Sequence, residues 1–334
     1  MVSGNELGNG VETRVKTTFI TKKRGDYAGI SVFERQIIDG LEDFCDILEY
    51  SLQGGYPLSR TVNRILSREL KKKIESYDQV LISDQALMVI DPEKVEAQLI
   101  PYVHDIFPAT KCFNNYIGQA LALYNVRRLE KCQKILTASK TVKQEIENST
   151  RFNGEAQVIY QGVDNLPEIK QRQPRDIDLL YVGSLQGRKN PGLLRRTFSK
   201  AIDQGYNVVH VTDDPKLPGQ NKQDITDKSL AEMYNRTRYY LHSSFAEGFG
   251  RCPVESQRYG ATPLALDIPI NQEILGEKGR HWKPISGTED VLQQLKNRKT
   301  VHRTFPQENS HRFKWEKTVE ELREALDLNQ EGIE

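Results

Sequence analysis

The stretch Ser243-Ser244-Phe245-Ala246-Glu247-Gly248-Phe249-Gly250-Arg251-Cys252-Pro253-Val254-Glu255 joins a short apolar run to an amphipathic one through a glycine-rich turn. The preceding run, Tyr239–Ser243, predicts a β-strand, and the following run, Pro253–Tyr259, predicts a helix. Glycines 248 and 250 let the backbone approach a ligand closely, and the free N–H groups at a helix start suit a phosphate or a sugar hydroxyl. The ligand expected here is therefore polar and anionic.

Two carboxylates, Glu247 and Glu255, lie eight positions apart across this turn. The spacing alone leaves two interpretations open. The glutamates could contact a ligand, or they could only complement the dipole of the helix that follows an ordinary glycine-rich turn. The sequence on either side of the turn is needed to distinguish these two interpretations.

Short β-rich runs alternate with amphipathic stretches on both sides of the turn, which predicts an α/β fold with doubly wound parallel sheets. The polar segment Gln161–Asp176, which contains Pro167 and Pro174, predicts a linker between two such units. A chain of 334 residues has room for two domains. We expect an N-terminal Rossmann-like domain over residues 1–165, a C-terminal one over 166–310, and a final helix within 311–334 that returns to the first domain.

The expected elements follow from hydrophobic periodicity. The strands are Thr17–Ile20, Asp46–Ser51, Gln79–Ser83, Leu99–Val103, Lys134–Ala138, Gln157–Tyr160, Asp178–Val182, Asn207–Val211, Tyr239–Ser243 and Thr262–Leu266. The helices are Ser31–Leu41, Ser59–Glu75, Asn114–Lys131, Thr141–Asn148, Pro191–Asp203, Ser229–Asn235, Pro253–Tyr259, Thr288–Asn297 and Trp315–Leu326.

Composition narrows the classes of function. The formal net charge is +1, so no global field attracts nucleic acid. The four cysteines are scattered without a Cys-x-x-Cys pair, which argues against a zinc site or a disulfide framework and fits a reducing compartment. The polar N-terminus lacks a signal-peptide core, and no run of about 18 apolar residues occurs. We expect a cytoplasmic protein that does not span the membrane.

Two further sites follow predicted strands. Arg188 and Lys189 come after the Asp178–Val182 run and before a helix, where two cations could neutralise a diphosphate, although a solvated pair would look the same. His104-Asp105 follows the Leu99–Val103 run, at the edge where an open α/β sheet binds ligands, although a structural His-Asp pair is the commoner occurrence.

Taken together, these segments resemble glycosyltransferase family 4, whose members are retaining enzymes of the GT-B fold. Glu247-Gly248-Phe249-Gly250 with Pro253-Val254-Glu255 is similar to the family's Glu-x7-Glu signature, and Gly260-Ala261-Thr262-Pro263 to the strand after it. Other similar segments occur in the family's order. They are Ala28-Gly29-Ile30, Val103-His104-Asp105, Val158-Ile159-Tyr160-Gln161-Gly162-Val163-Asp164, Tyr181-Val182-Gly183-Ser184-Leu185, Arg188-Lys189-Asn190 and Phe313-Lys314-Trp315-Glu316-Lys317. Ser184 departs from the family pattern, where an Arg is frequent.

The resemblance implies a transferase that moves a hexose-like unit from a UDP- or GDP-sugar to an acceptor hydroxyl, with no cofactor or metal. It places Glu247 and His104 at the transferred sugar, Arg188 and Lys189 at the diphosphate, and Glu255 at the ribose. Gly29, Gly183, Ser184, Gly248, Phe249 and Gly250 complete the implied donor site. A nucleotide-sugar epimerase or hydrolase and a noncatalytic sugar-nucleotide-binding protein remain as alternatives.

Two other motifs each allow a structural and a functional interpretation. Asp176-Ile177-Asp178 precedes its strand instead of following one, so we interpret it as a connection and not as an Asp-x-Asp metal site. The helix expected at Ser59–Glu75 carries a basic row on one side, which is either a solvated face or a contact with anionic lipid near a membrane-bound acceptor. That row consists of Arg60, Arg64, Arg68, Lys71 and Lys72.

Overall fold

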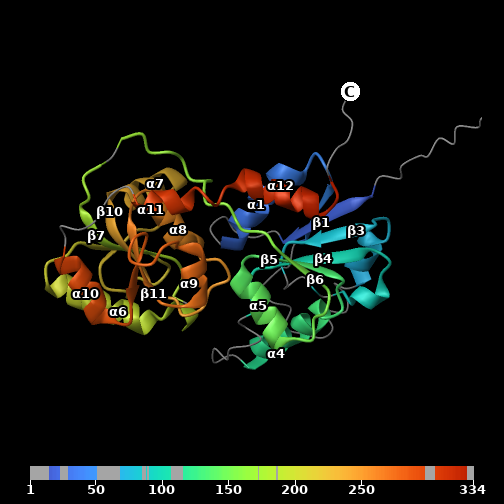
Figure 1. Cartoon of the computed structure of the whole chain (residues 1–334), viewed down its shortest axis with the longest axis horizontal. Helices are drawn as coiled ribbons and strands as arrows, with labels where there is room; N and C mark the ends of the chain where they lie inside the picture. Colours follow the sequence, from blue (N-terminus) through green and yellow to red (C-terminus); the bar gives the residue numbers. More distant parts are fainter. Residues whose placement is uncertain are drawn as a thin grey trace, which may run out of the picture.

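The computed structural model describes residues 15–22, 29–50, 68–84, 88, 90–106, 116–171, 173–185, 187–297 and 305–328, and every structural statement below concerns these residues. Within them the chain forms two parallel sheets, each covered by helices and lying side by side in Figure 1. The doubly wound α/β architecture expected from the sequence is therefore present.

The N-terminal sheet has the strand order β2-β1-β3-β4-β5-β6, and each pair of neighbours is parallel. Its strands are β1 (Thr17–Lys22), β2 (Asp46–Tyr50), β3 (Gln79–Ile82), β4 (Gln98–Val103), β5 (Lys134–Thr137) and β6 (Glu155–Val158). Its helices are α1 (Gly29–Leu41), a helix over 68–74, the short η2 (Pro92–Lys94), α4 (Tyr116–Leu129) and α5 (Lys140–Ser149).

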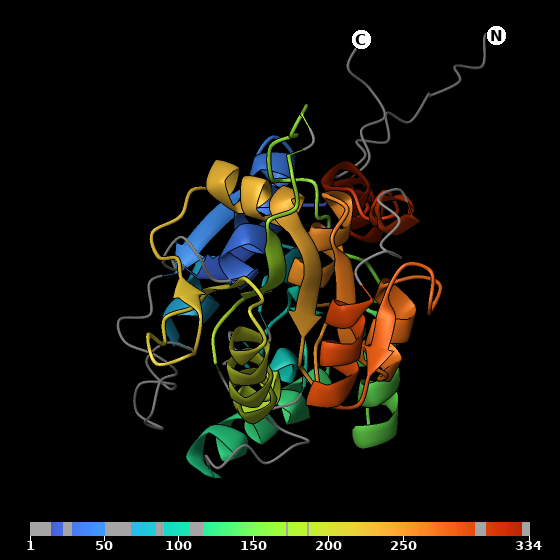
Figure 2. The ribbon, with the colours of Figure 1, turned by 90° about the vertical axis from the view of Figure 1, so that its left-hand side faces the viewer.

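The C-terminal sheet has the order β12-β11-β10-β7-β8-β9, again parallel throughout. Its strands are β7 (Ile177–Val182), β8 (Val208–Val211), β9 (Gln220–Asn221), β10 (Thr237–His242), β11 (Thr262–Leu266) and β12 (Lys283–Ile285). The helices are η3 (Gly187–Lys189), α6 (Pro191–Asp203), α7 (Asp227–Arg236), α8 (Arg251–Arg258), α9 (Pro269–Ile274), α10 (Thr288–Lys296) and α11 (Phe305–Ser310). Figure 2 faces this domain and shows α6 and α10 packed together on one side of the sheet.

Local sequence accounts for several helix starts. Ser139 and Thr226 accept hydrogen bonds from the first turns of α5 and α7, as N-cap hydroxyls do. At the start of α6, Asn190 adopts a left-handed conformation (φ 53°), its side chain accepts from the Leu193 N–H, and Pro191 occupies the first helical position. These caps fix where the loops at the sheet edges turn into helices.

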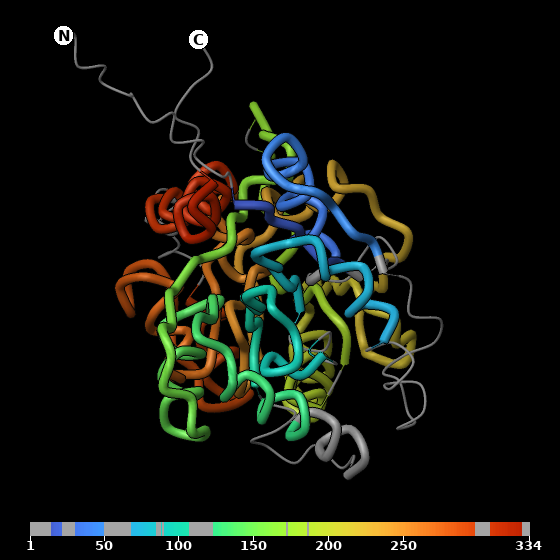
Figure 3. Tube along the Cα trace, turned by 90° about the vertical axis from the view of Figure 1, so that its right-hand side faces the viewer, coloured from blue at the N-terminus to red at the C-terminus, as the bar shows by residue number. Residues whose placement is uncertain are grey.

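The last helix, α12 (Trp315–Ala325), crosses back and packs on α1 of the N-terminal domain (Figures 1 and 3). Among the hydrogen bonds that hold it, Thr318 Oγ1 donates to the Tyr160 carbonyl at 2.8 Å, Arg323 to the Gly40 carbonyl at 2.7 Å, and Lys134 to the Ala325 carbonyl at 3.0 Å. The predicted return of the C-terminal helix is confirmed.

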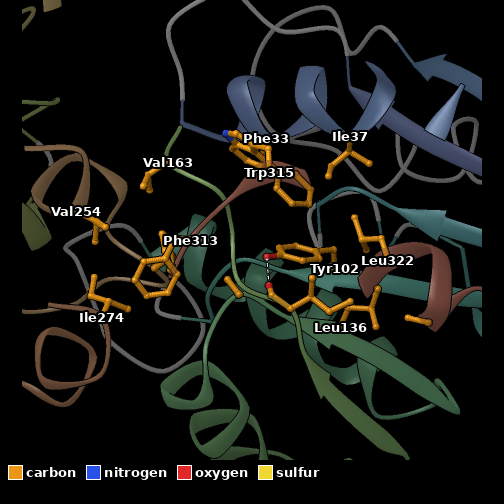
Figure 4. Packing of buried hydrophobic residues seen from close by; sticks show 14 of the residues in the cluster. Phe33, Ile37, Tyr102, Leu136, Val163, Val254, Ile274, Phe313, Trp315 and Leu322 are labelled. Atoms are coloured by element: carbon orange, nitrogen blue, oxygen red, sulfur yellow. Dashed lines mark hydrogen bonds between the residues drawn. The ribbon is translucent and has the colours of Figure 1, made fainter. Parts of the chain in front are cut away.

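One apolar core spans both domains. Phe33, Ile37 and Tyr102 of the N-terminal domain share a buried cluster with Val254 and Ile274 of the C-terminal domain, and Trp315 and Phe313 lie among them (Figure 4). The buried Tyr102 hydroxyl donates to the Ile159 carbonyl at 2.7 Å, which satisfies it within the cluster. The domains are therefore joined by packed apolar surface as well as by the connecting chain.

Some expected elements differ from the structure. The strand expected at Gln157–Tyr160 lies at Glu155–Val158, and the short elements β9, β12, α9 and α11 were missed. Each of these four is six residues or fewer, too short for a periodic pattern to emerge. Of the helix expected at Ser59–Glu75, the structure describes the part over 68–74, and Arg60 and Arg64 lie outside the described residues.

Candidate active site

The C-terminal sheet reverses its winding between β7 and β10, which are neighbours although β8 and β9 come between them in sequence. Ligands of open α/β sheets bind at such a switch point, beyond the carboxyl ends of the strands. Arg188 and Lys189 follow β7 on the one-turn helix η3, and Glu247 follows β10. The topology thus brings together three side chains that the sequence placed about 60 positions apart.

The Glu247 carboxylate binds both cations. Arg188 Nη1 donates to Oε2 at 2.6 Å, and Lys189 Nζ donates to Oε1. The Glu247 side chain is 6% exposed, and the two cations are about one-fifth exposed. The loop after β7 is held to the loop after β10 by the Phe245 N–H, which donates to the Arg188 carbonyl, and by the Ser243 hydroxyl, which donates to the Lys189 carbonyl.

These contacts determine the charge state of the cluster. Burial opposes ionisation of Glu247, but Lys189 and Arg188 outweigh it and hold the pKa of this carboxyl well below its usual range. Burial lowers the pKa of the neighbouring His242 to about 4. The pKa of Arg188 is raised because Glu247 and Asp105 outweigh its burial. At neutral pH Glu247 is therefore ionised and the imidazole of His242 is neutral.

Gly183 and Ser184 begin the loop after β7. Gly183 has φ 142°, a region that favours glycine, and its N–H donates to the Val211 carbonyl at 3.0 Å. The Tyr181 hydroxyl donates to the Ser184 carbonyl at 2.7 Å. Both residues are half-buried beside η3, so this loop reaches Arg188 in a defined conformation.

The second signature carboxylate, Glu255, lies in the first turns of α8 and is buried. Arg251 Nη2 donates to its Oε1 at 2.7 Å, and the Tyr234 hydroxyl donates to its Oε2 at 3.2 Å. Arg251 also reaches the Asn165 side chain at 3.4 Å and lies 5.8 Å from the centre of the Trp315 ring. This arginine therefore connects the carboxylate to the interdomain linker and to α12.

The turn between the two glutamates meets the other domain. A Cβ on Gly248 would lie 1.8 Å from the His104 carbonyl oxygen, and the Gly248 carbonyl accepts from the Ser139 hydroxyl at 2.7 Å. Gly250 is the N-cap of α8 with φ 84°. The Phe249 side chain is buried against Tyr160 and Phe313, so only its backbone remains for the ligand contact predicted for this residue.

His104 lies after β4, buried at the same interdomain contact. Its Nε2 lies 2.9 Å from the Ser83 carbonyl, and its Nδ1 lies 3.1 Å from the Gln161 amide nitrogen. A carbonyl only accepts, so Nε2 carries the proton and Nδ1 accepts from Gln161. Gly29, the remaining predicted N-terminal contact, is the first residue of α1.

The structure also shows residues that the sequence interpretation missed. Ser139 touches the signature turn, and Glu273 of α9 accepts from the Lys140 N–H at 2.7 Å and from the Thr141 N–H at 2.9 Å, both across the domain interface. Ser139 is recognisable in the sequence as an N-cap, but nothing in the sequence places it opposite Gly248. His242 lies within the predicted strand Tyr239–Ser243, where nothing in the local sequence indicates that its side chain lies beside Glu247.

Other predicted features lie away from this site. Asp176 pairs with Arg236 and Asp178 with Arg238, so both carboxylates of the Asp-x-Asp motif are engaged in ion pairs. Arg68, Lys71 and Lys72 are exposed on the helix over 68–74. Among the described residues, no helix is both long and apolar enough to cross a membrane.

Comparison with known proteins found no matching family model. The O-antigen chain mannosyltransferase RfbU of Salmonella typhimurium is 24% identical over 172 residues, which is 47% of this chain and 48% of RfbU. The serotype-specific mannosyltransferase WbdA of Escherichia coli is 26% identical over 101 residues, 28% of this chain and 12% of WbdA. The chain thus aligns with about half the length of RfbU and with a smaller part of WbdA.

Solved structures match over nearly the whole chain. Sucrose-phosphate synthase from Thermosynechococcus elongatus has a TM-score of 0.76 at 13% identity, covering 94% of this chain and 98% of that one. HepE of Anabaena, in complex with UDP and glucose, has a TM-score of 0.71 at 14% identity, covering 94% and 99%. The protein therefore has the two-domain GT-B fold.

Proposed function

We propose that this protein is a nucleotide-sugar-dependent glycosyltransferase that transfers a hexose-like unit to an acceptor hydroxyl between its two domains. The observation that carries the proposal is the cluster of Arg188, Lys189 and Glu247 at the switch point of the C-terminal sheet. Two local sequence relatives are mannosyltransferases, and the fold neighbour HepE binds UDP and glucose, which supports the same reaction class.

The chemistry of the cluster suits departure of a nucleoside diphosphate. Negative charge develops on the diphosphate as the glycosidic bond breaks, and two fixed cations stabilise that charge. Both cations are bound to Glu247, so a diphosphate competes with this carboxylate for them. Glu247 is then released to face the transferred sugar, where positive charge appears in the transition state.

We assign the remaining roles as follows. Glu255, charge-paired with Arg251, accepts from the ribose hydroxyls, and the backbone of Gly183, Ser184, Gly248 and Gly250 surrounds the diphosphate and sugar. We assign His104 as a polar contact to the donor sugar and not as a general base, which requires its ring to exchange the Ser83 or the Gln161 hydrogen bond for one to the sugar. Transfer proceeds with retention at the anomeric carbon, from a UDP- or GDP-sugar, without a metal ion or other cofactor.

The test is a panel of UDP- and GDP-sugars, each measured for stabilisation of the protein and then incubated with and without a glycan acceptor. Transfer that requires both substrates, with a product linkage of the donor's anomeric configuration by NMR, supports the proposal. Sugar release or epimerisation of the donor at the same rate without acceptor indicates the hydrolase or epimerase alternative. Tight binding without turnover for any acceptor indicates a noncatalytic protein.

A further inference from the structure

A second basic site lies on the outer side of the N-terminal domain. A cavity of about 440 Å³ opens between the helix over 68–74, the segment that carries η2, and the last turns of α4. Five cationic side chains and one carboxylate line it: Lys71, Lys94, Arg127, Arg128, Lys131 and Asp91. The proposed transferase reaction uses none of them.

Topology separates this cavity from the interdomain site. The helix α4 comes after the carboxyl end of β4, where His104 lies, and its last residue, Leu129, is followed closely by the start of β5 at Lys134. Its final turns therefore lie towards the amino edge of the parallel sheet. The lining residues Arg127 and Arg128 belong to these turns, so they lie at the opposite edge from His104.

The cavity has an excess of positive charge. Lys131 pairs with Asp91 at 3.1 Å and with Glu93 at 2.6 Å. Lys71, Lys94 and Arg127 are exposed, and no carboxylate within the described residues forms an ion pair with them. The five lining cations face two carboxylates, Asp91 and Glu93, so the cavity has a net charge of +3.

Arg128 is already oriented by an aromatic partner. Its guanidinium lies 3.8 Å from the centre of the Tyr124 ring, and Nη2 donates to the Tyr124 hydroxyl. Its Nε and Nη1 are buried without a hydrogen-bond partner among the described residues. These two nitrogens are shielded from solvent, so Arg128 contributes positive charge to the cavity wall and no free donor at these two atoms.

The walls of the cavity are anchored in the core. Leu70, Ile90, Val126 and Leu129 are next to lining residues in sequence or line the cavity themselves, and all four are buried in one apolar cluster behind it. The cations are therefore carried by backbone that packing holds in place, which lowers the cost of gathering them around a ligand.

We propose that this cavity binds a phosphate group of two or more negative charges, independently of the donor site. Tyr124, which lines the cavity, is 45% exposed, and its neighbour in sequence Leu123 is 44% exposed. Exposed apolar side chains next to cations suit the boundary between lipid headgroups and acyl chains, so a phosphorylated headgroup is the source that the geometry favours over a free phosphate.

The experiment compares the parent protein with Lys71→Gln/Lys94→Gln/Arg127→Gln, which changes three exposed side chains. The matched control, Lys216→Gln/Lys228→Gln/Lys296→Gln, removes three exposed cations from the C-terminal domain. One arm measures sedimentation with vesicles of phosphatidylcholine containing phosphatidic acid, against phosphatidylcholine alone. The other arm measures binding of pyrophosphate by calorimetry, with the donor site saturated by nucleoside diphosphate.

Binding in either arm that falls about fivefold per removed cation in the site variant, and not in the control, supports the proposal. Vesicle binding without pyrophosphate binding identifies a lipid headgroup, and the reverse identifies a free phosphate. The proposal is overturned if the parent binds neither probe, or if the site variant and the control lose the same affinity. Nucleoside diphosphate affinity should be equal in all three proteins, so failure here leaves the proposed transferase function untouched.

Discussion

Gly248 of the signature turn lies directly against the main-chain carbonyl of His104, so that a Cβ at position 248 would approach its oxygen to 1.8 Å. The two residues belong to different domains, and both are predicted to contact the donor. This backbone contact limits how closely the two domains approach at the proposed site, because there is no room between Gly248 and the His104 carbonyl even for a methyl group.

Gly248→Ala should therefore force the domains apart. Overpacking against backbone is expected to cost about 1–3 kcal/mol of the free energy of unfolding and to reduce turnover strongly. Denaturant unfolding and steady-state rates measure the two effects. The control is Gly192→Ala in α6, where the added methyl meets side-chain atoms and no backbone, Arg196 Nη1 at 3.3 Å and Asn190 Oδ1 at 4.0 Å. Parental turnover in Gly248→Ala would show that the close contact is not needed during catalysis.

Glu247→Gln should cut turnover by about two to three orders of magnitude, since a charge at the reacting centre is lost. Affinity for the free nucleoside diphosphate should be unchanged or higher, because Arg188 and Lys189 no longer have to leave a carboxylate. Calorimetry and single-turnover rates on the same preparation test both. A correctly folded variant with near-parental turnover would remove Glu247 from the transferred sugar.

Glu255→Gln should mainly weaken binding of the nucleoside diphosphate, whereas Glu247→Gln mainly lowers turnover. A ribose hydrogen bond to a carboxylate is made in ground and transition states alike, so we expect nucleoside diphosphate binding to weaken by about ten- to a hundredfold. Tyr234→Phe removes the 3.2 Å hydrogen bond to Oε2 together with the hydroxyl's contact to the Cys252 thiol, and it should have a much smaller effect. Equal losses in the two variants would indicate that Glu255 is structural.

His242 should make stability depend on pH. Burial lowers its pKa in the folded protein from 6.5 to about 4, so the unfolded chain takes up the proton first as pH falls. The free energy of unfolding should therefore fall between pH 6.5 and 4, by about 3 kcal/mol from this residue. Denaturant melts of His242→Gln over the same pH range should show a flatter profile than those of the parent, and equal profiles would contradict the prediction.

Turnover should persist in excess chelator, because the proposed reaction assigns neutralisation of the leaving diphosphate to Arg188 and Lys189 instead of a metal ion. The measurement is the steady-state transfer rate in the presence of EDTA and again after magnesium is restored. A complete loss that magnesium reverses would contradict the proposed metal-free mechanism, while a partial loss that scales with donor affinity would reflect removal of magnesium from the nucleotide sugar.

Much of the molecule was predictable from local sequence. The alternation of β-rich and amphipathic runs gave the doubly wound sheets, since core-facing periodicity is encoded residue by residue. The signature turn between Glu247 and Glu255 was likewise visible, because a strand end, two glycines and a helix start are adjacent in the chain. Elements of six residues or fewer, such as α9, carried too little periodicity to be found.

Tertiary structure alone decided which charges meet. The pairing of Glu247 with Arg188 and Lys189 follows from β10 lying next to β7, a long-range contact that no local pattern encodes. The same holds for Gly248 against His104 and for the cations around Arg128, which come from three separate segments. Sequence periodicity determines which face of an element is buried, but only the packed chain determines which polar groups are left opposite one another.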